Sequence, residues 1–341
     1  MRDRGGYFSY TSPFTGEEIG LGRNRKHAIQ VAMRGNAAAL AQKPDIMDRI
    51  MGKVERSWSD WLDKYTAILD ERELKDSTRR TYRSQIGRAR NLWKVAVKDI
   101  STAMVADALD AIRATGKART AQAFRTFLLD CFREAIAQGW IDRNPAEPTR
   151  AVAVKVKRAR LTLEAFRGVA EASVTWLHNA VLLALVSGQR REDVAGAKFA
   201  DFRDGHWWLT QNKSGKRLAI PLSLRLDVMD LTLEDVVRQC RSTGVLSPFL
   251  VHQTQDFGNS PRGRRIWVDT LSRRFTHTLE PLGFDWAGRN PPTFHEVRSL
   301  SARLYTAQGG VDVQQLLGHS EASMTEVYRD ARGDWTRVKI G

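Results

Sequence analysis

The spacing of apolar and polar residues predicts a small mixed module at the start of the chain. Residues 6–10 and 18–21 alternate between the two kinds, as strands do, and a turn-rich segment separates them. A helix should follow from about Arg25 to Leu40, with Asn24 as its cap. A unit of this size has little core, so we expect it to be marginally stable alone.

Helical spacing then dominates residues 57–144. Four amphipathic helices are predicted there, which together would form a compact bundle. Their candidate N-caps are Ser57, Ser77 and either Ser101 or Thr102. The tryptophans of the first helix are expected in the core of the bundle, because apolar residues at helical spacing are usually buried.

A mixed region follows, and its first two helices are predicted at Leu163–Ala172 and Trp176–Val186. The second is apolar on all sides and should be buried. Residues 206–209 and 217–220 are predicted strands, joined by a hairpin turn that contains Lys213. Further helices are expected at about 231–240, 267–282, 294–309 and 312–317. The predicted fold is multidomain: a small α+β N-terminal module, an all-α helical bundle, and a mixed α+β, mainly helical, C-terminal domain.

Two polar segments mark the boundaries between these parts. Residues 44–56 form a plausible connector, and residues 150–160 hold five basic residues and no acidic ones. The second segment has no helix cap, so we expect an extended linker. Such a linker could lie along a phosphate backbone or simply be solvated. The predicted domains are therefore 1–43, 57–149 and 161–341.

The charge of the chain narrows the class of partner. Its 54 lysines and arginines outnumber 39 aspartates and glutamates, which gives a formal net charge of +15. Such a surplus attracts polyanions, of which nucleic acid is the commonest. A membrane surface is the rival, but no apolar run approaches the roughly 20 residues of a spanning helix. The N-terminus also lacks the apolar core of a signal peptide, so we expect no membrane association.

The cysteines indicate the compartment of the protein, and the positions of the basic residues indicate where DNA would bind. Cys131 and Cys240 lie far apart and are expected to be core thiols in a reducing compartment. No cysteine and histidine cluster has zinc spacing, so neither a metal nor another cofactor is predicted. The candidate DNA contacts are the basic residues of the second bundle helix and of the linker, namely Arg79, Arg80, Arg83, Lys155, Lys157, Arg158 and Arg160.

One stretch near the C-terminus suggests a phosphate site. Thr293 and Glu296 have the spacing of a capping box, so a helix should begin there. His295 and Arg298 are three residues apart and would share one face of that helix. The unpaired N–H groups and partial positive charge of a helix start favour an anion. A histidine and an arginine at that place therefore indicate phosphate.

Four more residues complete a coherent chemistry. Arg190 follows a predicted helix break, Lys213 lies in the hairpin turn, and His319 and Tyr328 come downstream. A phosphodiester under attack gains charge on its equatorial oxygens, which arginines and imidazole N–H groups can stabilise. A tyrosine can be the nucleophile, and a lysine can protonate the departing 5′-oxygen. Each residue alone could be an ordinary surface or core residue, but the combination supports phosphoryl transfer without a metal.

The same residues resemble the tyrosine recombinases, most of all the integrases of lambda-like phages. The motifs that carry this resemblance, in chain order, are Gly188–Arg190 with Asp193, Lys213–Gly215, His295 with Arg298, Leu316–His319 and Tyr328. The likeness extends to residues 132–137 and 144–145 of the bundle and to residues 20–23. It therefore covers nearly the whole chain.

The resemblance implies roles for the residues of the phosphate site. Tyr328 would be the nucleophile that forms a 3′-phosphotyrosine. Arg190 and Arg298 would clamp the scissile phosphate, and His319 would be a further donor. Asp193 would orient the arginine clamp.

The resemblance also implies the proton transfers and the partners. Lys213 would protonate the 5′-hydroxyl leaving group, and His295 would hydrogen-bond the phosphate or help to take the tyrosine proton. The N-terminal module would bind distal arm sites, the helical bundle would bind the core site, and the C-terminal domain would catalyse. The bundle and the catalytic domain would form a clamp around the crossover site. The partners would be double-stranded DNA at attachment sites, further copies of the chain in a tetramer on DNA, and accessory DNA-bending and excision-directing proteins in a bacterial cytoplasm.

The leading interpretation is thus a site-specific DNA recombinase that integrates, and also excises, a phage or related element. One departure concerns the N-terminus: relatives have a longer basic tail before the first strand, where this chain has only residues 1–5. Either its arm-site contacts are weaker or differently built, or the natural start lies upstream. The tail at 335–341 is expected to restrain the tyrosine of a neighbouring protomer. Two alternatives stay open, a type IB topoisomerase and a catalytically silent DNA-binding protein.

Overall fold

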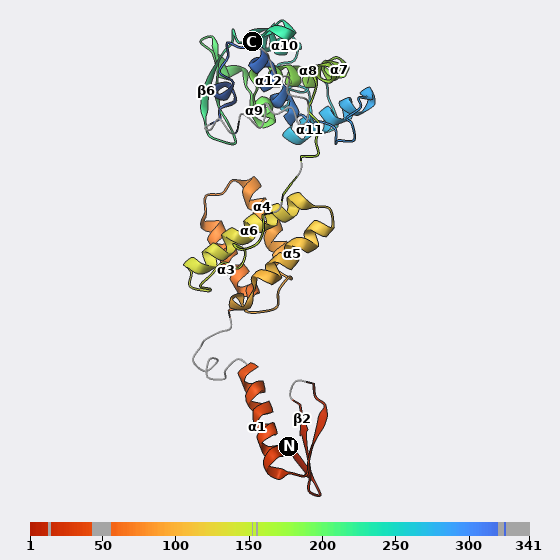
Figure 1. Ribbon diagram of the computed structural model, residues 1–341. Helices are drawn as coiled ribbons and strands as arrows, with labels where there is room; N and C mark the ends of the chain where they lie inside the picture. Colours follow the sequence, from red (N-terminus) through yellow and green to blue (C-terminus); the bar gives the residue numbers. More distant parts are fainter. Residues whose placement is uncertain (13–14, 43–55, 152, 155, 320–323, 325–341) are drawn as a thin grey trace, which may run out of the picture. The chain divides into compact units, whose positions relative to one another are not determined.

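The computed structural model describes residues 1–12, 15–42, 56–151, 153–154, 156–319 and 324 (Figure 1). The predicted connector, except residue 56, lies outside the described residues. So do Lys155, Tyr328 and the C-terminal tail. The chain divides into two compact units, Met1–Lys155 and Val156–Gly341. This division falls inside the predicted linker.

The first unit begins with a three-stranded antiparallel sheet, in the order β1–β2–β3, that packs against one helix. The elements are β1 (Arg2–Arg4), β2 (Tyr7–Thr11), β3 (Glu18–Gly22) and α1 (Arg25–Gln42). Asn24 caps α1 as predicted, because its Oδ1 accepts a hydrogen bond from the His27 backbone N–H at 3.1 Å. The core is small and contains Phe8, Tyr10 and Ala28. Strand β1 has only charged residues, so apolar alternation does not predict it.

The described range 56–151 contains four α-helices, as predicted. They are α3 (Trp58–Glu71), α4 (Asp76–Ala89), α5 (Thr102–Ala114) and α6 (Ala118–Ala137), with the short 3-10 helix η1 (Val97–Asp99) before α5. Trp58 and Trp61 are fully buried, which confirms their place in the core. Their indole N–H groups donate to the Ala89 carbonyl at 2.8 Å and to the Cys131 sulfur at 3.2 Å. Burial therefore leaves neither donor unsatisfied.

Local capping signals are correct at two of the three predicted helix starts in the bundle. Ser57 and Asp60 form a full capping box, and the Ser101 hydroxyl accepts from a backbone N–H three residues further along at 3.2 Å. The Ser77 prediction is wrong, because α4 begins at Asp76 and Ser77 lies inside its first turn. The acidic Asp76 suits this first turn, where the helix dipole favours a negative charge.

The second unit is mainly helical, with two small antiparallel sheets. Its helices are α7 (Leu163–Ala172), α8 (Thr175–Ser187), α9 (Arg191–Gly196), α10 (Leu233–Arg241), α11 (Val268–Leu279), α12 (His295–Gln308) and α13 (Val313–Leu317). The larger sheet has the order β4 (Phe202–Arg203), β5 (His206–Thr210), β6 (Arg217–Pro221), and the smaller pairs β7 (Arg225–Leu226) with β8 (Leu231–Thr232). Three 3-10 helices are η2 (Phe199–Asp201), η3 (Asp227–Met229) and η4 (Glu280–Leu282). The predicted fold class is confirmed.

Helix α8 lies at the centre of this unit, packed against α7, α10 and α12 (Figure 1). It is buried almost along its whole length, as its apolar sequence predicts. It ends at Gly188 in the left-handed conformation, with φ +66°. The next two residues follow directly from this turn, Gln189 buried in the core and Arg190 partly exposed. Strands β5 and β6 form the predicted hairpin, paired from His206 with Pro221 to Thr210 with Arg217.

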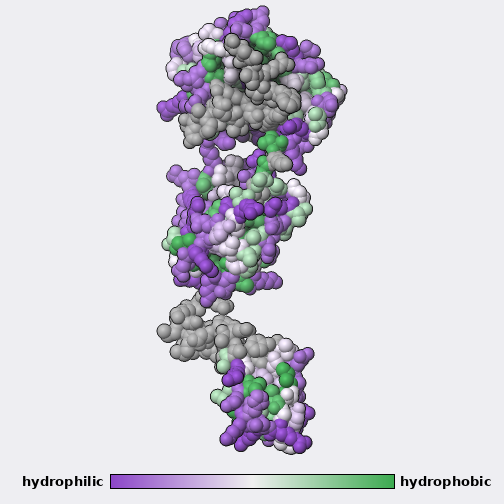
Figure 2. Space-filling model, viewed as in Figure 1, coloured by the Kyte–Doolittle hydropathy of each residue, from purple (hydrophilic) through white to green (hydrophobic). Residues whose placement is uncertain are grey.

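The outer surface of the folded parts is mostly hydrophilic in the view of Figure 2. Helix α8 is apolar, but it has 13 residues and lies inside its unit. Within the described ranges, no helix combines the length and the apolar composition that a membrane crossing needs.

Candidate active site

Helix α12 starts where a helix was predicted and carries His295 in its first turn, with Arg298 three residues on. Arg298 is almost fully buried, with 1% of its surface exposed. Its Nη1 donates to the Gly188 carbonyl at 2.7 Å, and its Nη2 donates to the Leu317 carbonyl at 2.6 Å. These carbonyls lie at the ends of α8 and α13. One guanidinium therefore joins the ends of two helices to a third.

Arg190 follows the left-handed turn that ends α8. A Cβ atom on Gly188 would meet Leu317 at 3.0 Å and Ser301 at 3.2 Å, and the positive φ adds strain for any other residue. Glycine therefore allows the turn to approach α12 and α13 closely. Arg190 is partly exposed, and its Nη1 donates to the Gln211 Oε1 at 2.9 Å.

His319 follows α13 and is 4% exposed. Its Nε2 lies 3.0 Å from the Arg298 Nη2. A guanidinium can only donate, so this contact requires Nε2 to accept, and the proton of neutral His319 must be on Nδ1. Burial lowers the pKa of His319 to about 4, with help from the positive charges of Arg298 and Arg190. His319 is therefore neutral near pH 7.

The β5–β6 hairpin carries Lys213, whose side chain is exposed at the turn. The turn closes where the Gln211 backbone N–H donates to the Lys216 carbonyl at 2.8 Å. Asp193 of α9 is 5% exposed, and its Oδ1 accepts from the backbone N–H of Asn212 at 2.8 Å and from its side chain at 3.2 Å. In the described part of the chain, Asp193 thus bonds the hairpin beside Lys213 and neither clamp arginine. This differs from the orienting role expected for it, because α9 presents the carboxylate to the hairpin backbone.

His295 lies at the surface of the same cluster. Partial burial of the ring lowers its pKa, and the charge of Arg298 lowers it further, while Glu296 acts in the opposite direction. Arg190 and Lys213 also lower it. Three cations are thus close enough to act on one imidazole, which is the electrostatic environment of an anion site.

The predicted capping box at the start of α12 is wrong, although the helix begins at that place. The N-cap residue, Phe294, forms no side-chain capping hydrogen bond, and the Glu296 backbone N–H donates to the Thr293 carbonyl at 2.8 Å. The Glu296 side chain is 3% exposed and forms an ion pair with Arg160 at 3.2 Å. Arg160 also donates to the Ser299 hydroxyl. A buried carboxylate needs a buried cation, and this pairing takes the place of the cap.

The same ion pair corrects the assignment of Arg160 as a DNA contact. Its side chain is 8% exposed and its charge is neutralised by Glu296. The preceding residue is also fixed, because the Ala159 backbone N–H donates to the Asn290 carbonyl at 2.9 Å. The end of the predicted linker therefore belongs to the second unit. A sequence motif cannot reveal this, since Arg160 and Glu296 are 136 residues apart.

The other predicted DNA contacts lie on the surface where the structure describes them. Lys157 is exposed, and Arg158 is partly exposed and donates to the Pro291 carbonyl at 3.3 Å. On α4, Arg80 and Arg83 are exposed and Arg79 is partly buried. Arg83 has only a weak, exposed ion pair with Asp70 at 4.0 Å.

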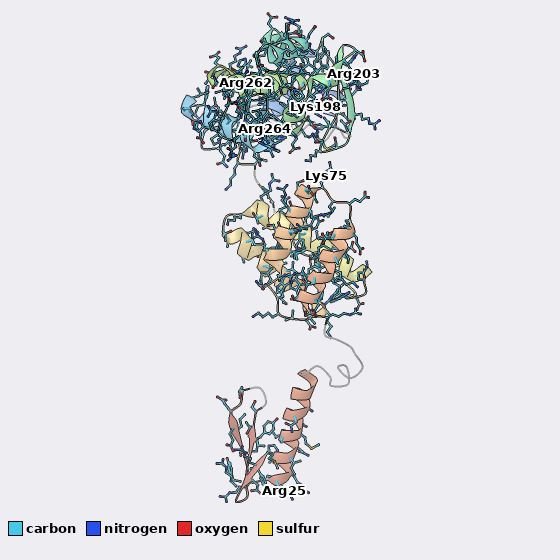
Figure 3. All side chains as sticks on the ribbon, turned by 180° about the vertical axis from the view of Figure 1, so that it is seen from behind. Arg25, Lys75, Lys198, Arg203, Arg262 and Arg264 are labelled. Atoms are coloured by element: carbon cyan, nitrogen blue, oxygen red, sulfur yellow. The ribbon has the colours of Figure 1, made fainter. Side chains whose placement is uncertain are left out.

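Sequence reasoning missed several basic side chains on the surface of the second unit. Lys198, Arg203, Arg262 and Arg264 are exposed, and Figure 3 labels them together with Arg25 and Lys75 of the first unit. They lie in loops and in a two-residue strand, where no periodic pattern identifies them. Local clusters of basic residues, such as residues 262–265, are the signal that could have found some of them.

The structure brings Arg190, Arg298 and His319 into one hydrogen-bonded cluster, with Lys213 and His295 at its edge. Helix α12 carries both His295 and Arg298. The other three side chains come from the segments that follow α8 and α13 and from the β5–β6 hairpin. Among the described residues, no group of histidines, cysteines and carboxylates is arranged to hold a metal ion. The arrangement can bind a tetrahedral anion and stabilise added negative charge on it.

Three family models match successive regions of the chain. The lambda integrase arm DNA-binding domain matches residues 1–49, the phage integrase central domain residues 55–152, and the phage integrase family residues 162–333. The integrase of Escherichia phage HK022 is 40% identical over 343 residues, which is 98% of this chain and 94% of that protein. The integrase of Escherichia phage lambda is 36% identical over 344 residues, with the same coverage.

Solved structures agree with these sequence matches. A lambda integrase dimer bound to a COC′ core site has a TM-score of 0.83 at 35% identity, covering 99% of this chain and 97% of that one. A lambda integrase tetramer bound to a Holliday junction has a TM-score of 0.81 at 35% identity, covering 98% and 96%. The likeness therefore holds over nearly the full length of both chains.

Proposed function

This chain belongs to the phage integrase family, as a lambda-like tyrosine recombinase, and from that membership we propose how it recombines DNA. It integrates, and also excises, a phage or related element by cutting and rejoining double-stranded DNA at attachment sites. The observation that carries this proposal is the buried cluster in which Arg298 contacts His319 at 3.0 Å while Arg190 is held nearby through Gln211. Such a cluster of donors suits a phosphate that gains charge during attack.

The proposed cleavage step needs no energy source beyond the phosphodiester bond itself. The phenolic oxygen of Tyr328 attacks the scissile phosphorus, and the bond from phosphorus to the 5′-oxygen breaks. Arg190 and Arg298 bind the non-bridging oxygens, and Lys213 gives its proton to the departing 5′-oxygen. The products are a 3′-phosphotyrosine and a free 5′-hydroxyl. Rejoining is the reverse reaction with the 5′-hydroxyl of a partner duplex.

The two histidines have different proposed tasks because their surroundings differ. His319 is buried and neutral, and it donates to the phosphate from Nδ1 while Nε2 accepts from Arg298. His295 is exposed, and its lowered pKa keeps the imidazole neutral at physiological pH. A neutral imidazole can hydrogen-bond the phosphate or accept the proton that Tyr328 loses.

We propose three DNA-handling modules along the chain. Residues 1–43 bind arm sites, residues 57–149 bind the core site, and residues 161–341 catalyse, joined by segments 44–56 and 150–160. The family matches to these three regions support the assignment. Exposed cations on α4 and in the linker, with the exception of Arg160, contact phosphates and make binding salt-dependent.

The proposed working form is a tetramer on DNA in the bacterial cytoplasm. The lambda integrase tetramer on a Holliday junction, at 35% identity, supports this assembly. Accessory DNA-bending and excision-directing proteins are further proposed partners, by analogy with the family. No cofactor is proposed, because side chains can supply the charge stabilisation and both proton transfers.

Covalent trapping tests the proposed chemistry directly. The full-length protein is incubated with a nicked crossover-site duplex, and a protein–DNA adduct is sought by denaturing gel electrophoresis. We expect an adduct that Tyr328→Phe abolishes; a catalytically silent binder would give none. Two duplexes should then yield joined recombinant product, whereas a type IB topoisomerase would only relax supercoils. If Tyr328→Phe still forms the adduct, the assigned nucleophile is wrong.

A further inference from the structure

Gln211, which follows strand β5, is fully buried and uses its whole hydrogen-bonding capacity. Its Oε1 accepts from Arg190 Nη1 at 2.9 Å and from the Ser214 hydroxyl at 2.8 Å. Its Nε2 donates to Gln189 Oε1 at 2.7 Å and to the Leu317 carbonyl at 3.0 Å. A side-chain amide has two donor hydrogens and an oxygen with two lone pairs, so all four positions are occupied.

The four partners of Gln211 belong to different parts of the candidate site. Arg190 is one arm of the clamp, and Ser214 is next to Lys213 in the hairpin turn. The Leu317 carbonyl also accepts from Arg298 at 2.6 Å, so it links Gln211 to the other arm of the clamp. One buried amide thus connects both arginines with the loop that carries the lysine.

The chemistry of this position requires a neutral amide. Arginine only donates, so the oxygen of Gln211 must face Arg190, and its nitrogen must face the two acceptors. A carboxylate of the same shape would place an acceptor against the Leu317 carbonyl. It would also form an ion pair with Arg190 and compete with the phosphate for that charge. An amide fixes the direction of the guanidinium and leaves its charge in place.

The backbone at Gly318 packs closely against this amide. A Cβ atom on Gly318 would lie 2.7 Å from Gln211 Oε1 and 2.8 Å from its Nε2, and the φ of Gly318 is +66°. Glycine therefore lets the turn before His319 approach the amide closely. The same contact ties the position of Gln211 to the segment that carries His319.

We propose that Gln211 is a positioning residue for strand cleavage, which aligns the Arg190 guanidinium and the Lys213 hairpin with the scissile phosphate. The inference rests on the proposed function, since it concerns the same site. Gln211 itself is buried and does not contact the DNA. Its removal should therefore slow the chemical step and leave DNA affinity unchanged.

Three scissile linkages distinguish positioning from a general structural role. The first is the natural phosphodiester; the second is a methylphosphonate, which lacks one anionic oxygen and so depends less on the clamp. The third has a 5′-bridging sulfur, whose thiolate leaves without a proton and so does not need Lys213. Single-turnover adduct formation is measured on each with the full chain and a nicked crossover-site duplex.

Gln211→Ala should slow cleavage of the phosphodiester by about 10²-fold, as expected for misplaced catalytic groups. On at least one modified linkage, Gln211→Ala should cleave less than about tenfold more slowly than the unaltered protein. The reason is that this linkage no longer needs the misplaced group. Gln211→Glu keeps the side-chain volume. It should cleave the phosphodiester more slowly still, and its cleavage rate should approach that of the unaltered protein on the methylphosphonate. Gln253→Ala, a buried glutamine elsewhere in the unit, is the matched control and should cleave at the unaltered rate.

The outcomes separate this inference from the proposed function. The contrary outcome is that the unaltered protein forms an adduct while the cleavage rate of both Gln211 variants falls by the same factor on all three linkages. In that case Gln211 has no positioning role. A loss of DNA affinity in proportion to the loss of rate would equally exclude that role. If the unaltered protein forms no Tyr328-dependent adduct on any linkage, the proposed function itself fails, and this inference with it.

Discussion

Two partly buried arginines, one in the helical bundle and one in the catalytic unit, are held in opposite ways. Arg72 donates to Asp130 at 2.9 Å and to Glu134, so two carboxylates neutralise it. Arg190 donates to the neutral amide of Gln211, and among the residues that the structure describes no carboxylate lies within ion-pair distance of it. Arg72 joins helices, whereas Arg190, in the proposed function, keeps its charge for the scissile phosphate.

The titratable neighbours of these arginines reflect the same difference. In the bundle, burial raises the pKa of Tyr65, and its hydrogen bond to Asp130 raises it further. In the catalytic unit, burial and the charges of Arg298 and Arg190 lower the pKa of His319 to about 4. A network that is closed within the chain stabilises structure. A cluster of several positive charges around buried imidazole is the environment that the proposed phosphate site needs.

Arg190→Ala should give the largest effect. Loss of one clamp arginine should slow adduct formation by about 10³-fold, as the removal of a transition-state donor does. The unfolding temperature should change little, because Arg190 is partly exposed. Arg190→Lys keeps the charge but loses the planar fork, so it should recover only part of the rate. An unfolding temperature that falls together with the rate would show that Arg190 is a structural cation like Arg72.

Arg160→Gln should come next, acting on stability rather than on DNA. It leaves Glu296 buried without its cation, which should lower the free energy of unfolding by about 3 kcal/mol. Denaturant titration measures this loss. The salt dependence of DNA binding should stay unchanged in Arg160→Gln, while Lys157→Gln should reduce its slope by about one. Equal salt slopes for the two variants would restore Arg160 as a DNA contact.

Arg72→Met should be milder, because the pair is partly exposed. It removes the cation between Asp130 and Glu134 and should lower the stability of the bundle by roughly 1–3 kcal/mol. Cleavage at saturating protein should be unaffected. Arg113→Met is the matched control, since its exposed pair with Asp110 should contribute less than about 0.5 kcal/mol. A cleavage defect at saturation in Arg72→Met would contradict the division between structural and catalytic cations.

The smallest effect should appear on acidification. The pKa of His319 is lower in the folded protein, so the unfolded chain binds the extra proton first. Its stabilising contribution is fully present above about pH 6.5 and is lost as pH falls from there towards 4. Between pH 7 and pH 5 the catalytic unit should lose on the order of 1 kcal/mol, measured by thermal unfolding. His319→Gln should flatten this part of the curve; an unchanged curve would mean that other groups cause it.

The elements that sequence patterns predict are those whose signal is local. Three such signals each lie within one continuous segment: the helical periods of the bundle, the apolar α8 and the two strands of the β5–β6 hairpin. The structure confirms all three. Caps at Ser57 and Ser101 need only three residues of context. The short α9 and the two-residue strands carry too few positions for a period, so patterns miss them.

Patterns in the amino-acid sequence are enough to predict most of the helices, the hairpin, the cationic surplus and the residue types of a phosphate site. How those residues are held depends on contacts that form when distant segments pack together. Gln211 meets Arg190, Gln189 and Leu317 across 21, 22 and 106 positions of sequence, and Arg160 meets Glu296 across 136. Such pairings have no period and no spacing rule. They arise because burial forces each polar group to find a partner, and packing decides which one is near.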